Sequence, residues 1–194
     1  MKKIIFATNN KHKLQEAKAL LGATVVLVSL DEVGLAGDIP ETAETLQGNA
    51  LQKAQWVWER TGMSCFSDDT GLEVAALGGA PGVYSARYAG EHCSFDDNID
   101  KLLAAMEGID DRRADFRTVV CLIEEGEPRY FEGQVDGEIL TERHGKGGFG
   151  YDPIFMPDRF GVSFAEMPLD VKNEISHRGR AMQQLAAYLN DKNK

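Results

Sequence analysis

Two adjacent carboxylates stand in the segment Ser67-Asp68-Asp69-Thr70-Gly71, directly after a short apolar stretch. Neighbouring like charges repel each other, and this cost is tolerated where a hard cation lies between the acids and a ligand, since magnesium prefers oxygen ligands. Neighbouring strand residues face opposite ways, so one Asp can enter a site while the other braces the loop. The alternative is a turn with two solvated acids.

An anion site is predicted at Thr8-Asn9-Asn10-Lys11-His12-Lys13, between a short strand and a helix. The first N–H groups of a helix lack intrahelical partners and carry partial positive charge, so they attract phosphate. Lys13 adds a full charge in the first turn. The G-x-x-x-x-G-K spacing of a Walker A loop is absent. The alternative is a simple N-cap with solvated lysines.

Two further segments carry charged groups near a helix start. Glu41 and Glu44 precede the helix expected at 45–60, and either could complete a metal site. The alternative is that these acids only stabilise the helix through its dipole. Asn49 and Lys53 are four residues apart and share one helix face. Lys53 could reach a phosphate, although a solvated lysine is the alternative.

The segment Gly147-Gly148-Phe149-Gly150-Tyr151-Asp152-Pro153 combines glycines with aromatic residues. Glycines permit close approach of the backbone to a ligand, and aromatic rings offer a stacking surface for a base. The alternative is a tight turn with two core aromatics. Lys172 and then Ser176-His177-Arg178 lie at or before the last expected helix, where Arg178 can bind a phosphate or a carbonyl oxygen in a forked geometry.

The elements that must position these residues alternate between strand-like and helix-like patterns, which is typical of an α/β fold. Both hairpin and crossover signals are present, so we expect a mixed, twisted sheet flanked by helices. We expect strands at 3–7, 24–28, 64–67, 114–124, 129–139 and 153–155, and helices at 14–21, 45–60, 96–106 and from Ser176 onwards.

The chain length and the amino-acid composition are typical of one globular domain over residues 1–194. The formal net charge of -10 argues against a nucleic acid or an anionic membrane as partner. Cys65, Cys93 and Cys121 are widely spaced without a C-x-x-C pair, which favours reduced thiols over a disulfide frame or a zinc site. With too short an N-terminal apolar run for a signal peptide, the expected location is cytoplasmic.

Five of these segments, in order along the chain, resemble the non-canonical purine nucleoside triphosphate pyrophosphatases, the inosine/xanthosine triphosphatases. The matching segments are Thr8–Lys13, Ser67–Gly71, Gly78–Tyr88, Gly147–Asp152 and Ile175–Gly179. The resemblance implies a fold of two lobes with the active-site cleft between them, usually a homodimer. It also implies Mg²⁺-dependent hydrolysis of dITP, ITP and XTP to the monophosphate and pyrophosphate.

The resemblance also implies roles for single residues. Asp69 matches the general base and metal ligand, and Glu41 the other metal-linked acid. The substrate-binding positions that this chain would use are Thr8, Asn9, Asn10, Lys11, His12, Lys13, Lys53, Thr70, Phe149, Gly150, Tyr151, Asp152, Lys172, His177 and Arg178. Relatives often carry Gly at the position of Asn9 and small residues at those of Lys11 and His12, whereas Lys13 is retained.

A mechanism follows as a hypothesis. Magnesium held by Asp69 and Glu41 bridges phosphate oxygens, Asp69 deprotonates a water that attacks the α-phosphorus, and the lysines stabilise the charge. One alternative is a house-cleaning pyrophosphatase for other modified nucleotides. Another is a nucleotide-binding regulator without turnover. A carboxylate-pair glycosidase is disfavoured, because the acids cluster with lysines.

Overall fold

The computed structural model describes residues 1–192, which form two compact units. Unit 1 contains Met1–Asp69, Thr118–Gly133 and the segment from Arg178 onwards, and unit 2 contains Thr70–Arg117 and Gln134–His177. The chain therefore passes between units four times, twice next to predicted site residues, at 69/70 and at 177/178. The expectation of a single domain stays a prediction.

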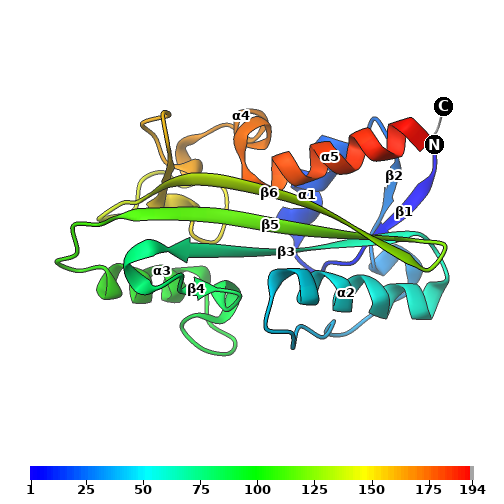
Figure 1. Cartoon of the computed structure of the whole chain (residues 1–194), viewed down its shortest axis with the longest axis horizontal. Coiled ribbons are helices and arrows are strands. Elements are labelled where there is room, and N and C mark those ends of the chain that lie inside the picture. Colours follow the sequence, from blue (N-terminus) through cyan, green and yellow to red (C-terminus); the bar gives the residue numbers. More distant parts are fainter. Residues whose placement is uncertain (193–194) are drawn as a thin grey trace. The chain divides into compact units, whose positions relative to one another are not determined.

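The chain combines strands and helices, which alternate from β1 to β3, and the predicted α/β class is confirmed (Figure 1). The hydrogen-bonded order of the strands is β2-β1-β3-β5-β6-β7, with β4 paired to β3. The strands are β1 (Lys3–Phe6), β2 (Val26–Val28), β3 (Cys65–Val74), β4 (Pro81–Gly82), β5 (Arg113–Glu124), β6 (Glu127–Ile139) and β7 (Phe155–Pro157). The α-helices are α1 (Lys11–Leu21), α2 (Leu46–Thr61), α3 (Phe95–Ala105), α4 (Leu169–Ile175) and α5 (His177–Lys192).

In unit 1, β1 pairs in parallel with β2 and β3, with Ile5 opposite Val28 on one side and Cys65 on the other. A parallel strand is normally covered on both faces, which explains the unbroken buried run Ile4-Ile5-Phe6. Helices α1 and α5 pack on one face, in a cluster with Phe6 and Phe66. Helix α2 contacts β3 through its main chain, where Ala50 and Ala54 accept hydrogen bonds from Ser67 Oγ and Cys65 Sγ.

Unit 2 contains the antiparallel pairs β3–β4 and β6–β7. In the stretches of β5 and β6 that belong to this unit, buried and more exposed residues alternate, because successive side chains point to opposite faces. Leu72, Phe116 and Val135 enter a core with Ile99 and Leu102 of α3. The intervening acids on β3, β5 and β6 face the other way.

Helix ends follow the expected local chemistry. Thr45 caps α2 by accepting from Gly48 N at 3.0 Å, and Gly62 ends it in the left-handed region at φ 61°. The turn between β5 and β6 is only Glu125-Gly126, at φ 54° and 84°, which suits the twist of a two-residue hairpin. This helix and this hairpin therefore lie within about two residues of their predicted positions.

Two predictions of local structure were wrong, and one helix was missed. Strand β3 does not end at Ser67 but continues through Asp68, Asp69 and Thr70 to Val74, because the acids find cationic or amide partners and stay in the ladder. The segment Asp152–Ile154 is a 3-10 turn, so β7 begins only at Phe155. Helix α4 was not predicted. Within residues 1–192 no helix is long and apolar enough to cross a membrane.

Candidate active site

The catalytic candidate Asp69 lies in unit 1 within a group of polar side chains that converge from three segments. Asn49 Nδ2 of α2 donates to Asp69 Oδ2 at 3.1 Å, and Lys53 Nζ lies 3.5 Å from Asp69 Oδ1. Lys53 also forms an ion pair with Glu41. Asn49 Oδ1 accepts from Ala43 N at 2.9 Å and so ties the loop that carries Glu41 to α2. The predicted metal-linked acids therefore share one lysine.

Asp68 faces a second, largely buried charge network of unit 1. Its carboxylate accepts from Arg178 Nε at 2.8 Å and from Lys13 Nζ at 3.1 Å. Arg178, which is 2% exposed, also donates to Glu16 of α1. A buried charge is costly unless it is paired and hydrogen-bonded, and here each charge has partners from other elements. Asp68 thus joins β3, α1 and the start of α5.

The pKa values of the two neighbouring acids shift in opposite directions. Burial raises the pKa of Asp69, and Lys53 and Lys13 offset this only in part. Burial acts on Asp68 too, but Lys13, Arg178 and Lys53 outweigh it and hold its pKa below the usual range. In many active sites, two neighbouring titratable groups take acid and base roles because their surroundings shift their pKa values in opposite directions. The surrounding cations therefore favour the charged form of Asp68, whereas the affinity of Asp69 for a proton is raised.

The start of α1 has an N-cap rather than open amides. Asn10 Oδ1 accepts from His12 N at 3.0 Å and from Lys13 N at 3.1 Å, while Thr8 Oγ1 accepts from Asn10 N. The cap interpretation of this segment is thus confirmed, but its lysine is not solvated. Burial lowers the pKa of Lys13 despite the nearby Asp68. Lys11 and His12 are exposed.

The unit 1 cluster suits a magnesium ion in its donor chemistry. Magnesium is usually bound through one or two carboxylates together with substrate phosphates, rather than in an all-protein cage. No group of three or more His, Cys, Asp or Glu side chains in the described part of the chain could hold a metal by itself. Glu41 and Asp69 supply the two carboxylates, with the Lys53 ammonium paired to both.

Unit 2 gathers the glycine segment and Lys172 into an aromatic cluster. Asp152 Oδ2 accepts from Lys172 Nζ at 2.7 Å and from Phe149 N at 3.0 Å. The Lys172 ammonium also lies 5.0 Å from the ring centroid of Phe149 and 5.6 Å from that of Phe164. Gly148 allows this turn, since it has φ 67° and an added Cβ would lie 2.1 Å from Asp152 Oδ2.

Tyr151 and His177, two other predicted site residues of unit 2, are buried. Tyr151 is buried, and its hydroxyl donates to Ser85 O at 2.7 Å. His177 is buried and stacks on Phe116 with ring centroids 4.6 Å apart. The alternative interpretation of a core aromatic therefore fits Tyr151, while Phe149 remains only half-buried.

The structure groups the predicted residues by unit. Unit 1 brings together Lys13, Glu41, Lys53, Asp69 and Arg178 with the neighbouring acid Asp68. Unit 2 brings together Phe149, Tyr151, Asp152, Lys172 and His177, and it also contains Thr70 and Gly150. Asn9 donates to Gly37 O at 3.1 Å and so links two loops.

No site role was predicted from the sequence for Glu16, which binds Arg178, or for Asn49, which binds Asp69. A Glu beside Ala17 on the buried face of α1 is the one signal for Glu16.

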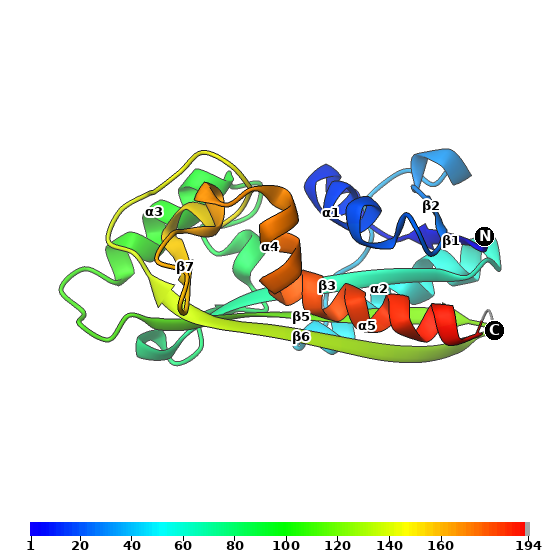
Figure 2. The same ribbon diagram turned by 90° about the horizontal axis from the view of Figure 1, so that it is seen from above.

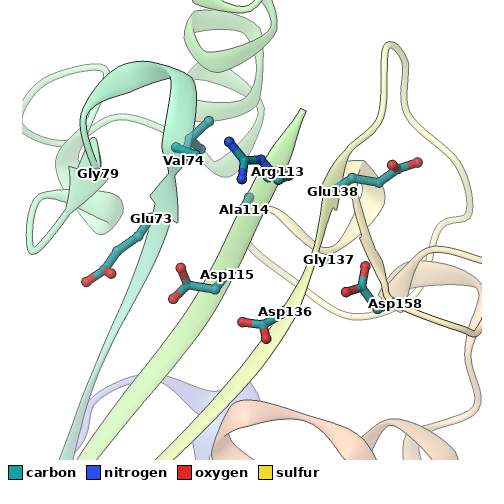
Figure 3. A pocket seen from close by; sticks show the side chains of 11 residues that line it. Glu73, Val74, Gly79, Arg113, Ala114, Asp115, Asp136, Gly137, Glu138 and Asp158 are labelled. Carbon is teal, nitrogen blue, oxygen red and sulfur yellow. The ribbon is translucent and has the colours of Figure 1, made fainter. Parts of the chain in front are cut away.

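A second polar site, on the outer face of unit 2, was not predicted. A cavity of about 540 Å³ is lined by acids of β3, β5 and β6, together with Arg113 and Asp158. Figure 3 shows the side chains of Glu73, Asp115 and Asp136 standing on the three strands. Burial, with Glu73 and Asp136 nearby, raises the pKa of Asp115 to about 6. Such a surface repels polyanions, so it is not the phosphate site.

The fold and these clusters define an α/β protein with a carboxylate–lysine centre in one unit and an aromatic cluster in the other. The model of the Ham1 family matches residues 4–188. The chain is 55% identical over 190 residues to a dITP/XTP pyrophosphatase of Porphyromonas gingivalis, covering 97% of this chain and 98% of that protein. A dITP/XTP pyrophosphatase of Flavobacterium johnsoniae is 51% identical over 187 residues, covering 96% and 97%.

Two solved structures are also similar to this chain in sequence and fold. A HAM1 protein from Coxiella burnetii is 40% identical with a TM-score of 0.89, covering 98% of this chain and 100% of that one. The Ham1 protein of Staphylococcus aureus is 38% identical with a TM-score of 0.88 and the same coverage. The chain belongs to the Ham1 family.

Proposed function

We propose that this protein hydrolyses dITP, ITP and XTP to the nucleoside monophosphate and pyrophosphate and so cleanses the nucleotide pool. The observation that carries the proposal is the pair Asp68–Asp69, with opposite pKa shifts beside Lys13 and Lys53. The relatives at 55% and 51% identity, over nearly their whole length, are both dITP/XTP pyrophosphatases.

The unit 1 cluster serves the phosphates in this proposal. Asp69 accepts a proton from water as the water oxygen attacks the α-phosphorus, and the bond from that phosphorus to the bridging oxygen breaks so that pyrophosphate leaves. The raised pKa of Asp69 suits a general base. Asn49 fixes the Asp69 carboxylate, and Lys13 and Lys53 stabilise charge on the phosphates.

Glu41 and Asp69 would hold Mg²⁺, which supplies positive charge to the phosphate oxygens when it is bound. The two carboxylates and their shared lysine support this assignment. The Lys53 ammonium forms ion pairs with both acids. Asp69 and Glu41 therefore raise the pKa of Lys53 in spite of its burial, and the lysine stays charged.

The unit 2 cluster serves the base. Hypoxanthine and xanthine present a 6-oxo acceptor where adenine presents a 6-amino donor. The Lys172 ammonium supplies a charged donor beside Phe149, which offers a face for stacking. A site built on buried polar groups rejects a base that leaves them unpaired by about 10⁴-fold or more. Thr70, Gly150, Tyr151 and His177 complete this proposed set.

Arg178 is assigned a further role beside the one that the sequence favoured. Its guanidinium binds Asp68 and Glu16, which supports a role in orienting Asp68. The contact with a phosphate or a carbonyl oxygen stays a prediction. Thr8, Asn9, Asn10, Lys11 and His12 remain proposed phosphate-side residues, although the N–H groups of His12 and Lys13 already donate to Asn10. A homodimer and a cytoplasmic location belong to the same proposal.

The test is release of pyrophosphate from ATP, GTP, CTP, dTTP, ITP, dITP and XTP with magnesium, for the wild type, Asp69→Asn and Asp68→Asn. We expect release from ITP, dITP and XTP alone. Asp69→Asn should fold normally and lose about 10²–10⁴-fold in turnover, the usual contribution of a general base. Asp68→Asn should instead lower stability, because it leaves two buried cations short of their partner.

The outcomes separate the candidate functions. Release of single phosphate, or full turnover by Asp69→Asn, would refute the mechanism. Tight binding of dITP without any pyrophosphate would favour the nucleotide-binding regulator. Turnover confined to other modified triphosphates would favour the alternative house-cleaning activity.

A further inference from the structure

Phe95 is a large aromatic residue at an unexpected place, the first position of α3, where its side chain is 47% exposed. It continues the apolar face of α3, whose next members Ile99 and Leu102 are fully buried. Where that face leaves the core, the ring of Phe95 meets the ring of Phe149 with centroids 6.0 Å apart and planes at 51°. Tilted aromatic pairs at 4.5–7 Å are favourable.

The segment that carries Phe149 needs such support. Gly147, Gly148 and Gly150 surround Phe149, and glycines leave a backbone with many accessible conformations. The Phe149 main chain is fixed by its donation to Asp152, and the Lys172 ammonium lies 5.0 Å from its ring centroid. The ring itself stays half-buried, so part of its surface is available to stack.

Helix α3 holds the same segment at a second point. Arg143, just before the glycines, donates through NH2 to Asp100 Oδ1 at 2.9 Å and to Asp96 Oδ1 at 3.2 Å. These ion pairs are exposed and individually weak. Together with the Phe95–Phe149 contact, they hold the first two turns of α3 against the loop at Arg143 and at Phe149.

We propose that Phe95 is a positioning residue that fixes the ring of Phe149 in the orientation in which it stacks on the purine, a role that rests on the proposed function. Phe95 acts through Phe149 and touches none of the reacting atoms. Its contribution is made before the nucleotide binds, since a ring held in place costs less to order on binding. Loss of Phe95 therefore weakens binding equally in the ground state and the transition state.

The kinetic test compares Phe95→Ala, Phe95→Tyr and the control Phe160→Ala with dITP as substrate. Phe160 is an equally exposed phenylalanine of unit 2, at 45%, in the turn after β7. We expect Phe95→Ala to raise KM about two- to tenfold at unchanged kcat, because an aromatic pair contributes on that order. Phe95→Tyr keeps the ring and should restore KM. A fall in kcat with KM unchanged, or an equal effect of Phe160→Ala, would refute the role.

A double-mutant cycle tests whether Phe95 acts through Phe149. In a Phe149→Ala background, Phe95→Ala should have no further effect on KM, because the ring that it positions is gone. Additive effects of the two substitutions would show an independent contact of Phe95 with the nucleotide and would overturn the positioning role.

A spectroscopic measurement separates this inference from the proposed function. A fluorinated phenylalanine at position 149 reports the surroundings of that ring by fluorine NMR without any nucleotide. Phe95→Ala should shift or broaden its signal, and Phe160→Ala should not. An unchanged spectrum in Phe95→Ala would refute the positioning role alone, whereas a wild type that fails to hydrolyse dITP would refute the proposed function.

Discussion

Asp68 and Asp69 are adjacent in the chain, yet the strand directs them to different partners. Asp68 receives Lys13 and Arg178, while Asp69 receives Asn49 and Lys53. One acid therefore stays charged at any moderate pH and the other holds a proton more readily. The physical cause is the number of cations around each carboxylate, because burial acts in the same direction on both.

A first prediction concerns Asp115 in the acidic cavity of unit 2. Its pKa is about 6 in the folded protein, against 3.8 for a free Asp. Between about pH 4 and pH 6 the folded state binds more protons than the unfolded state, so this group lowers stability as the pH rises through that window. Asp115→Asn should raise Tm at pH 7.5, by at most about 2–4 °C, and have little effect at pH 4.

Thermal unfolding at the two pH values measures this effect. Asp110→Asn, an exposed neighbour on the chain, is the control and should shift Tm equally little at both. If Asp115→Asn lowered Tm at pH 7.5, its carboxylate would be stabilising and the assigned direction of the shift would be wrong.

The sequence indicated the types of the site residues better than their partners. Asp69, Glu41 and Lys53 were predicted from motif and resemblance, and they do lie together. Glu16 was not identified, and Asn49 was noted only as sharing a helix face with Lys53, because the contacts that give each its role join different elements. For the same reason the sequence did not show that Arg178 binds two buried acids. Its predicted contact with the nucleotide stays a prediction.

At the scale of elements, the start of α1 combines a helix cap with a predicted phosphate site. Asn10→Ala removes the acceptor for two N–H groups and should cost about 1 kcal/mol, or about 2–4 °C in Tm. Asn10→Asp keeps an acceptor at the cap, so Tm should be retained while the added negative charge raises KM for dITP. Calorimetry and steady-state kinetics separate the two effects. An unchanged KM in Asn10→Asp would argue that phosphate does not approach this helix start.

The glycine segment gives a prediction with a closely matched control. Gly148→Ala places a Cβ 2.1 Å from Asp152 Oδ2, at φ 67°, so Asp152 must move away from Lys172. Loss of this charge-assisted hydrogen bond should raise KM for dITP about tenfold or more. Gly161→Ala has nearly the same φ, 69°, and open space around its Cβ.

Both variants therefore share the strain of a left-handed alanine, and kinetics compares them directly. Equal KM values in the two variants would show that the Asp152–Lys172 pair does not contribute to nucleotide binding.

Elements with strong local signals were predictable and the others were not. Thr45 and Gly62 mark the ends of α2 by cap chemistry, and the Glu125-Gly126 turn marks the hairpin. The length of β3 was underestimated, because the adjacent acids Asp68 and Asp69 are typical of a turn. Their partners Arg178 and Asn49, which keep them in the strand, lie far away in the sequence. Helix α4 has only seven residues and offers too little periodicity to detect.

At the scale of the whole molecule, three long strands pass from one unit to the other without interruption. We therefore expect one cooperative unfolding transition, since neither unit has a continuous chain of its own. Both tryptophans, Trp56 and Trp58, lie on α2 of unit 1, so tryptophan fluorescence reports that unit alone. Far-UV circular dichroism reports both units.

Urea unfolding followed by the two signals measures this cooperativity. Coincident curves would support the prediction of a single domain over residues 1–194. A fluorescence transition at a different midpoint would show that the units unfold separately and that the prediction is wrong.

Glu124, at the end of β5, is a buried carboxylate that binds Lys2 and also Lys192, the latter at 3.2 Å. Two lysines close to opposite ends of the described chain thus meet on one side chain, and Figures 1 and 2 show the start of β1 and the end of α5 at the right-hand side of both views. A short peptide could join these ends, with new termini opened at an exposed turn such as the one after Gly78. The molecule is in this respect prepared for circular permutation.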